Sequence, residues 1–414
     1  MSFGLTSLNV LLITQYFPPD LGGVASRANN LAKGLVLNGC QVTVITAFPH
    51  YPHGKIPAQY RFVPIKVEYM GKIKVIRTFM PPIKSEGFFK RLLLMTFFAA
   101  SSLFAFPWIE KNDAVFGTSW VPGLIYSRVK KVPLVLDVCD LTVEDLPLLK
   151  LASEDSIFVK IASTVYRLFY VKGDAVTPIS PGYVETINNK YCVKQSKIHV
   201  IEIGVDSKEF TSYGNASIAK GHPFKVTYAG VLGIGYDFEQ IFEAARILKD
   251  KAIKVEFILH GSGECLEYIR TRLKELNLVN IKLSDKLLGS RKEVASFLNE
   301  ADALILPLKD YDAPYPGIPS KLYEYQAIGK PIICCANGEP AKYISKSNSG
   351  IIVKPGEPKA LADAVAYLVT NPEIASTMGK NGRKYIEQEV TIAVIGAKLK
   401  SLFVKLKEDQ LLIA

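Results

Sequence analysis

Short apolar runs alternate with amphipathic stretches along most of the chain. The first run, LNVLLIT at residues 8–14, is continuously apolar, as in a strand buried on both faces of a sheet. A loop, YFPPDLGG, and an amphipathic stretch containing Leu31, Leu35 and Leu37 separate it from the next apolar run, VTVIT. This opening predicts a strand, a helix and a second strand parallel to the first.

The alternation continues and then restarts after a polar, Gly-containing segment. Further strands are predicted at IKVIRT, DAVFGT, VPLVLDV and DAVTPIS before that segment, and at FKVTYAG, VEFILHG, NIKLSD, DALILPL, KPIICCA and GIIVKP after it. The pattern predicts the α/β class with two doubly wound, Rossmann-like domains, since 414 residues exceed a single core. We predict an N-terminal domain at 1–205, a C-terminal domain at 206–390 and an amphipathic helix at 391–414.

Basic residues are concentrated in one part of the N-terminal domain. The chain has 50 Lys and Arg against 39 Asp and Glu, and residues 55–91 contain nine basic and two acidic residues. Eighteen uncharged residues follow, at 92–109, and Thr96, Ser101 and Ser102 interrupt their apolar character. Such a strip beside an apolar helix favours contact of region 55–109 with an anionic membrane surface, although solvated lysines or a buried helix are alternatives.

The sequence argues against a metal site, a cofactor site and nucleic-acid binding. The six Cys residues include no C-x-x-C pair and only five His are present, so neither a metal site nor a cofactor is predicted. The basic residues are not interleaved with stacking aromatics, which argues against nucleic-acid binding. The N-terminus lacks a signal-peptide pattern, and we expect a cytoplasmic protein that is peripheral at the inner face of the cell membrane.

Candidate chemistry lies where predicted parallel strands end, because ligands of open α/β sheets bind there. In the first such loop, Gly22 and Gly23 precede a helix and would let backbone N–H groups approach an anion closely. Arg27, one turn into that helix, could add a bidentate phosphate contact. A plain Gly-Gly turn and a surface salt bridge are the alternatives.

The segment GIPSKLYEYQAIGKP at residues 317–331 is the second candidate. Ser320 has the position of an N-cap, and Lys321 and the first N–H groups of the helix would face phosphate. Glu324 lies one turn further on nearly the same face, where its carboxylate could hold two ribose hydroxyls. A capped helix with a local ion pair would give the same pattern.

These motifs together resemble the retaining family 4 glycosyltransferases of the GT-B fold. PPDLGG, IHVIEIGVD, VEFILHGSGE and KLYEYQAIGKP match that family's motifs in order over almost the whole chain. Gly22-Gly23-x-x-x-Arg27, FPHYPHGK and PSK are similar to a branch that extends lipid-linked sugars in surface polysaccharide or glycan assembly. The resemblance implies two domains facing a central cleft, with the C-terminal helix crossing back to the N-terminal domain.

The resemblance also implies roles for individual residues. Glu324 matches the second glutamate of the family's E-x7-E motif, whereas Pro316 occupies the place of the first. Val231 replaces an arginine that many members use for the donor diphosphate, so Lys321, Ser320 and Arg27 are the substitutes. The implied donor site comprises Gly22, Gly23, Gly230, Gly261, Gly263, Gly317, Ser320, Lys321 and Glu324.

Acids and histidines of the N-terminal domain are the candidates for the acceptor site. Asp140 and Glu144 in the loop DVCDLTVED align approximately with acids of the resembling branch and could orient the acceptor hydroxyl. His50 and His53 follow a predicted strand and could contact the acceptor. Solvated acids and functionally silent histidines are the alternatives.

The implied reaction transfers a sugar from a nucleotide donor, with UDP the commonest in the family, to a lipid-linked or membrane-associated saccharide with retention of configuration. The catalytic candidates are Lys321, Glu324, Asp140 and Arg27, which would stabilise charge on the leaving diphosphate or orient the acceptor. A non-catalytic membrane-surface scaffold on the same fold, or a nucleotide-sugar epimerase, would be compatible with the same domains. The donor sugar and the acceptor glycan are not predicted.

Overall fold

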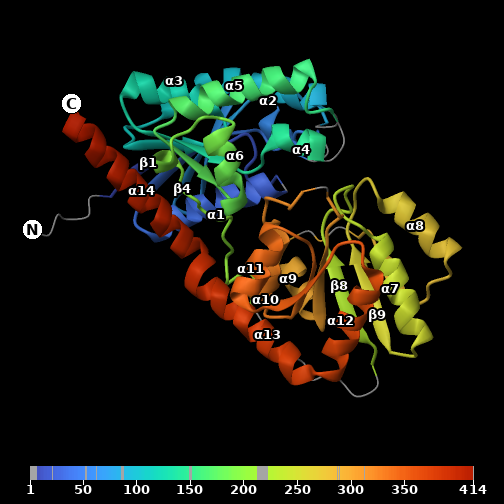
Figure 1. The fold of residues 1–414 in the computed structure, drawn as a ribbon. Coiled ribbons are helices and arrows are strands. Elements are labelled where there is room, and N and C mark those ends of the chain that lie inside the picture. The colour runs from blue at the N-terminus through green and yellow to red at the C-terminus, as the bar shows by residue number, and fades with distance from the viewer. Residues whose placement is uncertain are drawn as a thin grey trace, which may run out of the picture. The chain divides into compact units, whose positions relative to one another are not determined.

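The chain forms two compact units, each built on one sheet (Figure 1). The computed structural model describes residues 7–20, 22–51, 54–61, 63–84, 88–148, 152–211, 222–286, 288, 290–311 and 313–413. The first unit comprises Met1–Val143, Glu154–Gly204 and Ile392–Ala414, and the second comprises Glu144–Ser153 and Val205–Thr391. Both are α/β units of the Rossmann type, as the alternation of apolar runs predicts.

The first sheet has seven strands in the order β3-β4-β2-β1-β5-β6-β7. All neighbours pair in parallel except β3 and β4, which are antiparallel. The order reverses between β1 and β5, and Val10 of β1 pairs with Val42 of β2 on one side and with Ala114 of β5 on the other. The strands are β1 (Asn9–Ile13), β2 (Gln41–Ala47), β3 (Ile65–Met70), β4 (Ile73–Thr78), β5 (Ala114–Gly117), β6 (Leu134–Val138) and β7 (Ala175–Pro178).

Helices cover both faces of this sheet (Figure 1). One layer contains α2 (Phe88–Leu103), α3 (Trp120–Lys130) and α5 (Ile157–Lys172), and the opposite face carries α1 (Gly23–Leu37) and α14 (Ile392–Ile413). In α1, Leu31 and Leu35 are fully buried, but Leu37 is 61% exposed, so the predicted apolar face ends at Leu35. Short helices α4 (Thr142–Leu148) and α6 (Val184–Asn189) complete the described helices up to residue 204.

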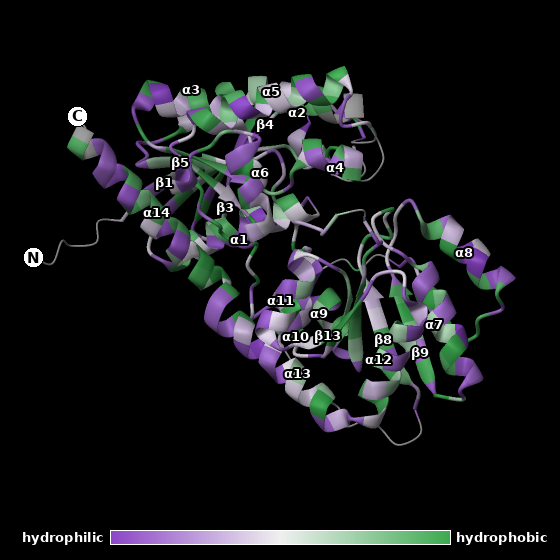
Figure 2. Ribbon diagram, viewed as in Figure 1, coloured by the Kyte–Doolittle hydropathy of each residue, from purple (hydrophilic) through white to green (hydrophobic). Residues whose placement is uncertain are grey.

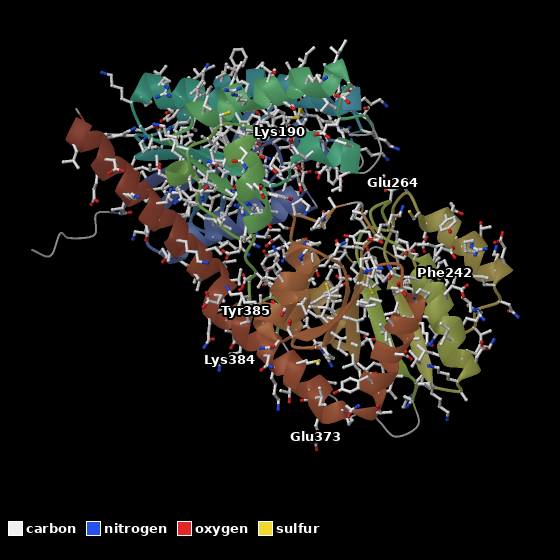
Figure 3. All side chains as sticks on the ribbon, viewed as in Figure 1. Lys190, Phe242, Glu264, Glu373, Lys384 and Tyr385 are labelled. Atoms are coloured by element: carbon white, nitrogen blue, oxygen red, sulfur yellow. The ribbon has the colours of Figure 1, made fainter. Side chains whose placement is uncertain are left out.

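The second sheet is wholly parallel, with six strands in the order β10-β9-β8-β11-β12-β13. Phe242 of α7 (Glu239–Asp250) is fully buried in the core of this unit (Figure 3). The strands are β8 (Phe224–Ala229), β9 (Val255–His260), β10 (Ile281–Ser284), β11 (Ala303–Pro307), β12 (Ile332–Cys335) and β13 (Gly350–Val353). The helices are α7 (Glu239–Asp250), α8 (Leu266–Glu275), α9 (Arg291–Asn299), α10 (Ser320–Ile328), α11 (Glu339–Ser347), α12 (Pro358–Thr370) and α13 (Pro372–Tyr385).

The C-terminal helix returns to the first unit, as the resemblance implies. In α14, Gly396 crosses Gly34 of α1 so closely that a Cβ on Gly34 would lie 3.1 Å from the Cα of Gly396. Lys400 donates to the carbonyl oxygen of Asn38 (2.7 Å), and the ring of Phe403 packs against Phe116 of β5. The last helix of the sequence is therefore part of the first folding unit.

Candidate functional site

Lys321 lies in the first turn of α10, beside the loops that follow β8 and β9. Its Nζ donates to the hydroxyl of Tyr236 (2.9 Å) and lies 4.7 Å from the centre of the Tyr236 ring. This position is the switch point of the second sheet, where β8 has β9 on one side and β11 on the other. Ligands of open α/β sheets bind at such points.

Glycines make this close approach possible. Gly230, directly after β8, has φ +141°, and a Cβ there would lie 2.3 Å from Cε of Lys321. Gly261, directly after β9, has φ +145°, and a Cβ there would lie 1.8 Å from the carbonyl oxygen of Gly230. Any larger residue at either position would displace the loop or Lys321. The structure thus brings together three of the predicted donor-site residues, and Gly263 follows in the same strand-end loop.

Glu324 is one turn along α10 and is held by an arginine that the sequence analysis did not identify. Oε1 of Glu324 lies 3.3 Å from Nη2 of Arg291, the first residue of α9. The Nε of Arg291 donates to Glu209 (2.8 Å), and its guanidinium stacks on the Phe210 ring at 4.9 Å. Burial raises the pKa of Glu324, while the positive charges of Arg291 and Lys321 oppose that rise.

Buried hydrogen bonds fix the orientation of α10. The backbone N–H of Ala229, at the end of β8, donates to the hydroxyl of Tyr325 (3.1 Å). Gln326 donates to the hydroxyls of Ser347 and Ser349 (2.7 and 2.8 Å). Because Tyr325 and Gln326 face the protein interior, Lys321 and Glu324 are left half-buried on the side of the helix that borders the strand ends.

The start of α10 differs from the predicted cap. Pro319, with φ −59° and ψ 137°, occupies the N-cap position, and no side chain caps the helix there. Ser320 is instead the first helical residue, so the prediction that its hydroxyl caps the helix is wrong. Its N–H still lies at the helix N-terminus, where an anion is favoured, and Gly317 is buried in the preceding loop.

Arg27 has a different role from the one predicted. In the first unit, its Nε and Nη2 donate to the two carboxylate oxygens of Asp137 (2.8 and 2.6 Å), and its Nη1 donates to the carbonyl oxygen of Glu202 (2.8 Å). Both side chains of the ion pair are 2% exposed. The guanidinium therefore joins α1 to the end of β6 and is not available for phosphate. Gly22 (φ +107°) and Gly23 do lie exposed at the N-terminus of α1.

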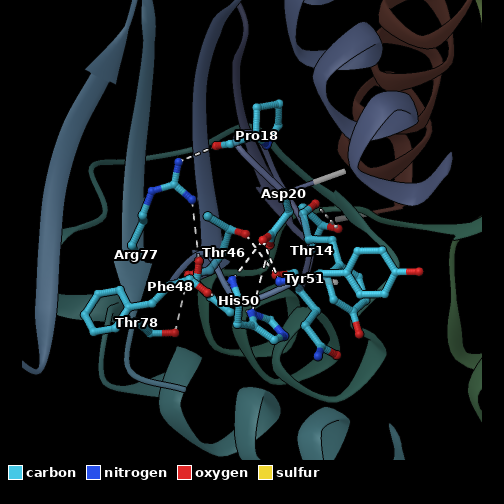
Figure 4. A network of polar contacts seen from close by, with 12 residues as sticks. Thr14, Pro18, Asp20, Thr46, Phe48, His50, Tyr51, Arg77 and Thr78 are labelled. Carbon is cyan, nitrogen blue, oxygen red and sulfur yellow. Dashed lines mark hydrogen bonds and ion pairs between the residues drawn. The ribbon is translucent and has the colours of Figure 1, made fainter. Parts of the chain in front are cut away.

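His50 is also enclosed in the first unit (Figure 4). Its Nδ1 is 2.8 Å from the carbonyl oxygen of Phe48, and its side chain is fully buried. The backbone N–H groups of His50 and Tyr51 donate to Oδ1 of Asp20 (2.8 and 2.9 Å). Burial raises the pKa of Asp20, and the charge of His50 opposes this most strongly. His50 thus organises the loop, its contact with an acceptor stays a prediction, and His53 lies outside the described residues.

The two acids predicted to contact the acceptor lie close in sequence but differ in exposure. Asp140 lies in the exposed loop after β6, and Glu144 lies half-buried in the first turn of α4. Their proposed role in orienting a hydroxyl remains a prediction.

A second candidate surface is the outer side of the layer formed by α2, α3 and α5 (Figure 2). Tyr126 of α3 packs on Phe106 in the turn after α2, and Trp120 of α3 packs on Tyr166 of α5. They contain seven basic residues and no Asp or Glu. Their large exposed apolar side chains are Leu92, Leu93, Met95 and Phe97 of α2, Val121, Ile125 and Val129 of α3, and Ile157, Phe158, Ile161, Val165, Leu168 and Val171 of α5.

The predicted apolar helix at 92–109 is an amphipathic part of this layer. Leu94 and Phe98 of α2 are buried against the sheet, whereas Leu93 is 52% exposed on the other side. Within the part of the chain that the structure describes, none of the helices has the length and apolar character of a membrane span.

The family follows from comparison with known proteins. Residues 21–209 match the family described as Glycosyltransferase Family 4, and residues 212–385 match the one described as Glycosyl transferases group 1. The chain is built from domains of these two glycosyltransferase families. The matches confirm the resemblance to these glycosyltransferases, while the lipid-linked branch and the donor-site residues stay predictions.

Individual relatives agree with these families. A putative colanic acid biosynthesis glycosyltransferase, WcaL of Escherichia coli K12, is 25% identical over 240 residues, which are 57% of this chain and 58% of the relative. The fold is similar to that of sucrose-phosphate synthase from Thermosynechococcus elongatus (TM-score 0.73, 18% identity, 96% of this chain and 99% of that one). It is also similar to that of Anabaena Alr3699/HepE in complex with UDP and glucose (TM-score 0.65, 17% identity, 96% and 99%). The two-domain GT-B fold is therefore established for this glycosyltransferase.

Proposed function

We propose that this protein transfers a sugar from a UDP-linked donor to a hydroxyl of a lipid-linked saccharide, with retention of configuration, at the inner face of the cell membrane. The observation that carries the proposal is the placement of Lys321 and Glu324, one turn apart, at the switch point of the second sheet. The UDP complex of the Anabaena protein supports it, as does the similarity to a putative colanic acid biosynthesis glycosyltransferase of Escherichia coli.

The charges at this point suit a nucleoside diphosphate. The ammonium of Lys321 and the N-terminus of α10 together favour an anion, and both act most strongly in a site from which water is excluded. The carboxylate of Glu324, positioned by Arg291, would accept hydrogen bonds from the two ribose hydroxyls. Diphosphate and ribose are thus recognised by two residues of one helix turn, despite the absent first motif glutamate.

The chemistry requires charge stabilisation more than a nucleophile. The acceptor oxygen forms a bond to the anomeric carbon on the face from which the diphosphate leaves, and the bond between that carbon and the phosphate oxygen breaks. The acceptor proton passes to an oxygen of the departing β-phosphate. Lys321 would stabilise the negative charge that grows on this diphosphate, while Asp140 and Glu144 are the acids proposed to orient the acceptor hydroxyl.

The direct test is a screen of nucleotide sugars by thermal shift, followed by transfer onto a polyprenyl-linked saccharide. We expect stabilisation by one UDP-sugar and a glycosylated lipid product whose anomeric configuration matches the donor. A nucleotide sugar that binds and is converted without any acceptor would instead support the epimerase, and the absence of nucleotide-sugar binding would support a scaffold.

Acidification should weaken UDP binding through Glu324. The ionised carboxylate is the stronger acceptor for the two ribose hydroxyls, and burial raises the pKa of Glu324 above its usual value of 4.5. As the pH is lowered from neutral, affinity should therefore begin to fall at a higher pH than for an ordinary glutamate. Calorimetric titration with UDP should show this fall in the wild type. Glu324→Gln should bind UDP more weakly at neutral pH and show a flatter pH profile, and an unchanged profile would contradict the assignment.

The layer of α2, α3 and α5 supports the membrane part of the proposal. An apolar surface whose helices contain basic residues and no acids complements anionic lipid. A second copy of the chain is a poorer partner, because a symmetric contact would place seven cations of one copy against seven of the other. We therefore extend the proposed membrane contact from region 55–109 to α3 and α5.

Vesicle sedimentation tests this contact. Replacing Lys84, Lys90 and Arg91 with alanine should weaken binding to vesicles of anionic phospholipid about 100-fold, because each cation near the surface contributes about 1 kcal/mol. The matched control replaces Lys249, Lys254 and Lys342, three exposed lysines of the second unit, and should bind as the wild type does. Equal sedimentation of both triple variants would count against the surface, as would equal binding to neutral vesicles.

A further inference from the structure

A large apolar groove lies in the first unit, beside α2. It has a volume of about 940 Å³ and is lined by residues of the segment 54–65, which includes the start of β3, by Phe79 and Pro82 after β4, and by residues of α2 and Phe104 directly after it. Its apolar lining includes Ile56, Val63, Ile65, Phe79, Phe97 and Phe104. The side chains of Phe79 and Phe104 are 43% and 72% exposed, so the groove leaves a considerable apolar area open to solvent.

The groove has few polar groups, and its charged side chains are of one sign. Lys55 and Arg61, both exposed, are the charged side chains among the described lining residues, and both are cationic. Two lining hydroxyls already have protein partners. Tyr60 donates to Glu68 (3.1 Å), and Ser101 donates to the carbonyl oxygen of Phe98 (3.2 Å). The groove therefore offers apolar surface and positive charge but few hydrogen-bonding groups for a saccharide.

We infer that this groove binds the hydrocarbon chain of the phosphate-linked lipid that carries the acceptor saccharide. The inference deepens the proposed function and rests on it. Three observations select this occupant. The lining is apolar, the charges beside it are complementary to a phosphate, and α2 contributes both to the groove and to the proposed membrane surface. A lipid chain could thus pass from the bilayer into the groove along Phe97 and Phe104, with its phosphate beside Lys55 or Arg61.

The groove has a role distinct from that of the docking surface. The outer side of α2, α3 and α5 would hold the protein on any anionic bilayer, whereas the groove would select one lipid molecule. Each methylene group transferred from water into the groove adds to affinity, so chain length should control binding more than the identity of the sugar. The phosphate contributes through Lys55 and Arg61, whose charges are not matched by an acid in the described lining.

Binding of farnesyl monophosphate in solution tests the inference. We expect farnesyl monophosphate to bind at least tenfold more tightly than farnesol and much more tightly than inorganic phosphate. Arg61→Ala should weaken farnesyl monophosphate but leave farnesol unchanged. Inorganic phosphate or a short saccharide phosphate binding as tightly as farnesyl monophosphate would show an anion or sugar site and would overturn the assignment to a lipid chain.

Filling the groove gives a matched pair of variants. Ala100 lines the groove from α2 and is exposed, so Ala100→Trp should occupy part of the space and weaken farnesyl monophosphate at least tenfold. Thr96, one turn earlier and also exposed, does not belong to the lining, so Thr96→Trp should bind the lipid normally. Equal affinity in both variants would contradict the groove. Both variants should unfold at the same temperature. Weaker lipid binding by Ala100→Trp would then result from filling of the groove and not from misfolding.

The two proposals fail in different ways. If the groove is wrong but the proposed function is right, UDP binds, a polyprenyl-linked acceptor is glycosylated, and Ala100→Trp leaves the Michaelis constant for that acceptor unchanged. If the proposed function is wrong, no lipid-linked saccharide is glycosylated although farnesyl monophosphate still binds. When both hold, Ala100→Trp raises the Michaelis constant for the lipid acceptor and leaves UDP affinity as in the wild type.

Discussion

Replacing Lys321 with alanine should lower kcat/KM for sugar transfer about 100- to 1,000-fold, the usual cost of removing one charge-stabilising group from an active site. The reason is the position of the Lys321 ammonium. The ammonium lies above Gly230 and beside Tyr236 at the strand ends, and in the proposed reaction the leaving diphosphate gains negative charge there. No arginine occupies position 231, where many family members have one, so less compensation is available. Steady-state assays with the donor identified by the screen measure this loss.

The fold of the Lys321→Ala variant should be intact. Lys321 is half-buried at the rim of the second unit, and its one described hydrogen-bond partner, Tyr236, is also half-buried and can bond to water. Thermal unfolding should therefore change little. The matched control is Lys342→Ala in α11, whose side chain is 74% exposed and pairs with Glu339, and this variant should retain full activity. Wild-type turnover in Lys321→Ala would remove Lys321 from the site.

Much of the fold could be predicted because the apolar pattern is strong. The runs at 224–230, 255–261 and 302–308 each contain one of the buried strands β8, β9 and β11. The strand β3 was not predicted. Its residues Ile65–Met70 alternate between half-buried and exposed at the edge of the sheet, and three of its side chains are charged or aromatic, so no continuous apolar run marks it.

The candidate site was only partly accessible from the sequence. Lys321 and Glu324 lie one turn apart in a single helix, a relation that local spacing reveals. Arg291 is brought to Glu324 by the packing of α9 against α10, a long-range contact that no spacing encodes. A possible signal was the helix start after β10, where the side chain of Ser290 accepts from the N–H of Glu293 and leaves Arg291 in the first turn.

For Arg27, local spacing in the sequence suggested a contact that differs from the one in the structure. The sequence places an arginine one turn after two glycines, which is a plausible phosphate site. The structure instead places Asp137, at the penultimate position of β6, within reach of the same guanidinium. A buried arginine requires a buried acid, and which acid supplies it depends on the strand order β1-β5-β6 and not on neighbours in sequence.

Arg27→Ala should therefore destabilise the first unit by about 3–5 kcal/mol, because Asp137 would remain buried with its charge uncompensated. Both tryptophans, Trp108 and Trp120, lie in the first unit, so urea unfolding followed by their fluorescence reports on that unit alone. The double variant Arg27→Met/Asp137→Leu should recover much of the loss, since replacing both charges leaves no unpaired ion.

The control for Arg27 is Arg128→Ala in α3, an exposed arginine of the same unit whose Nη2 donates to the carbonyl oxygen of Lys172 (3.0 Å). Its loss should change the free energy of unfolding by no more than about 0.5 kcal/mol. If Arg27→Ala unfolds like the wild type yet loses UDP-sugar affinity, the guanidinium contacts phosphate after all. If it unfolds at lower urea and the double variant restores both stability and sugar transfer, Arg27 acts by holding α1, with Gly22 and Gly23 at its N-terminus, against the strand ends.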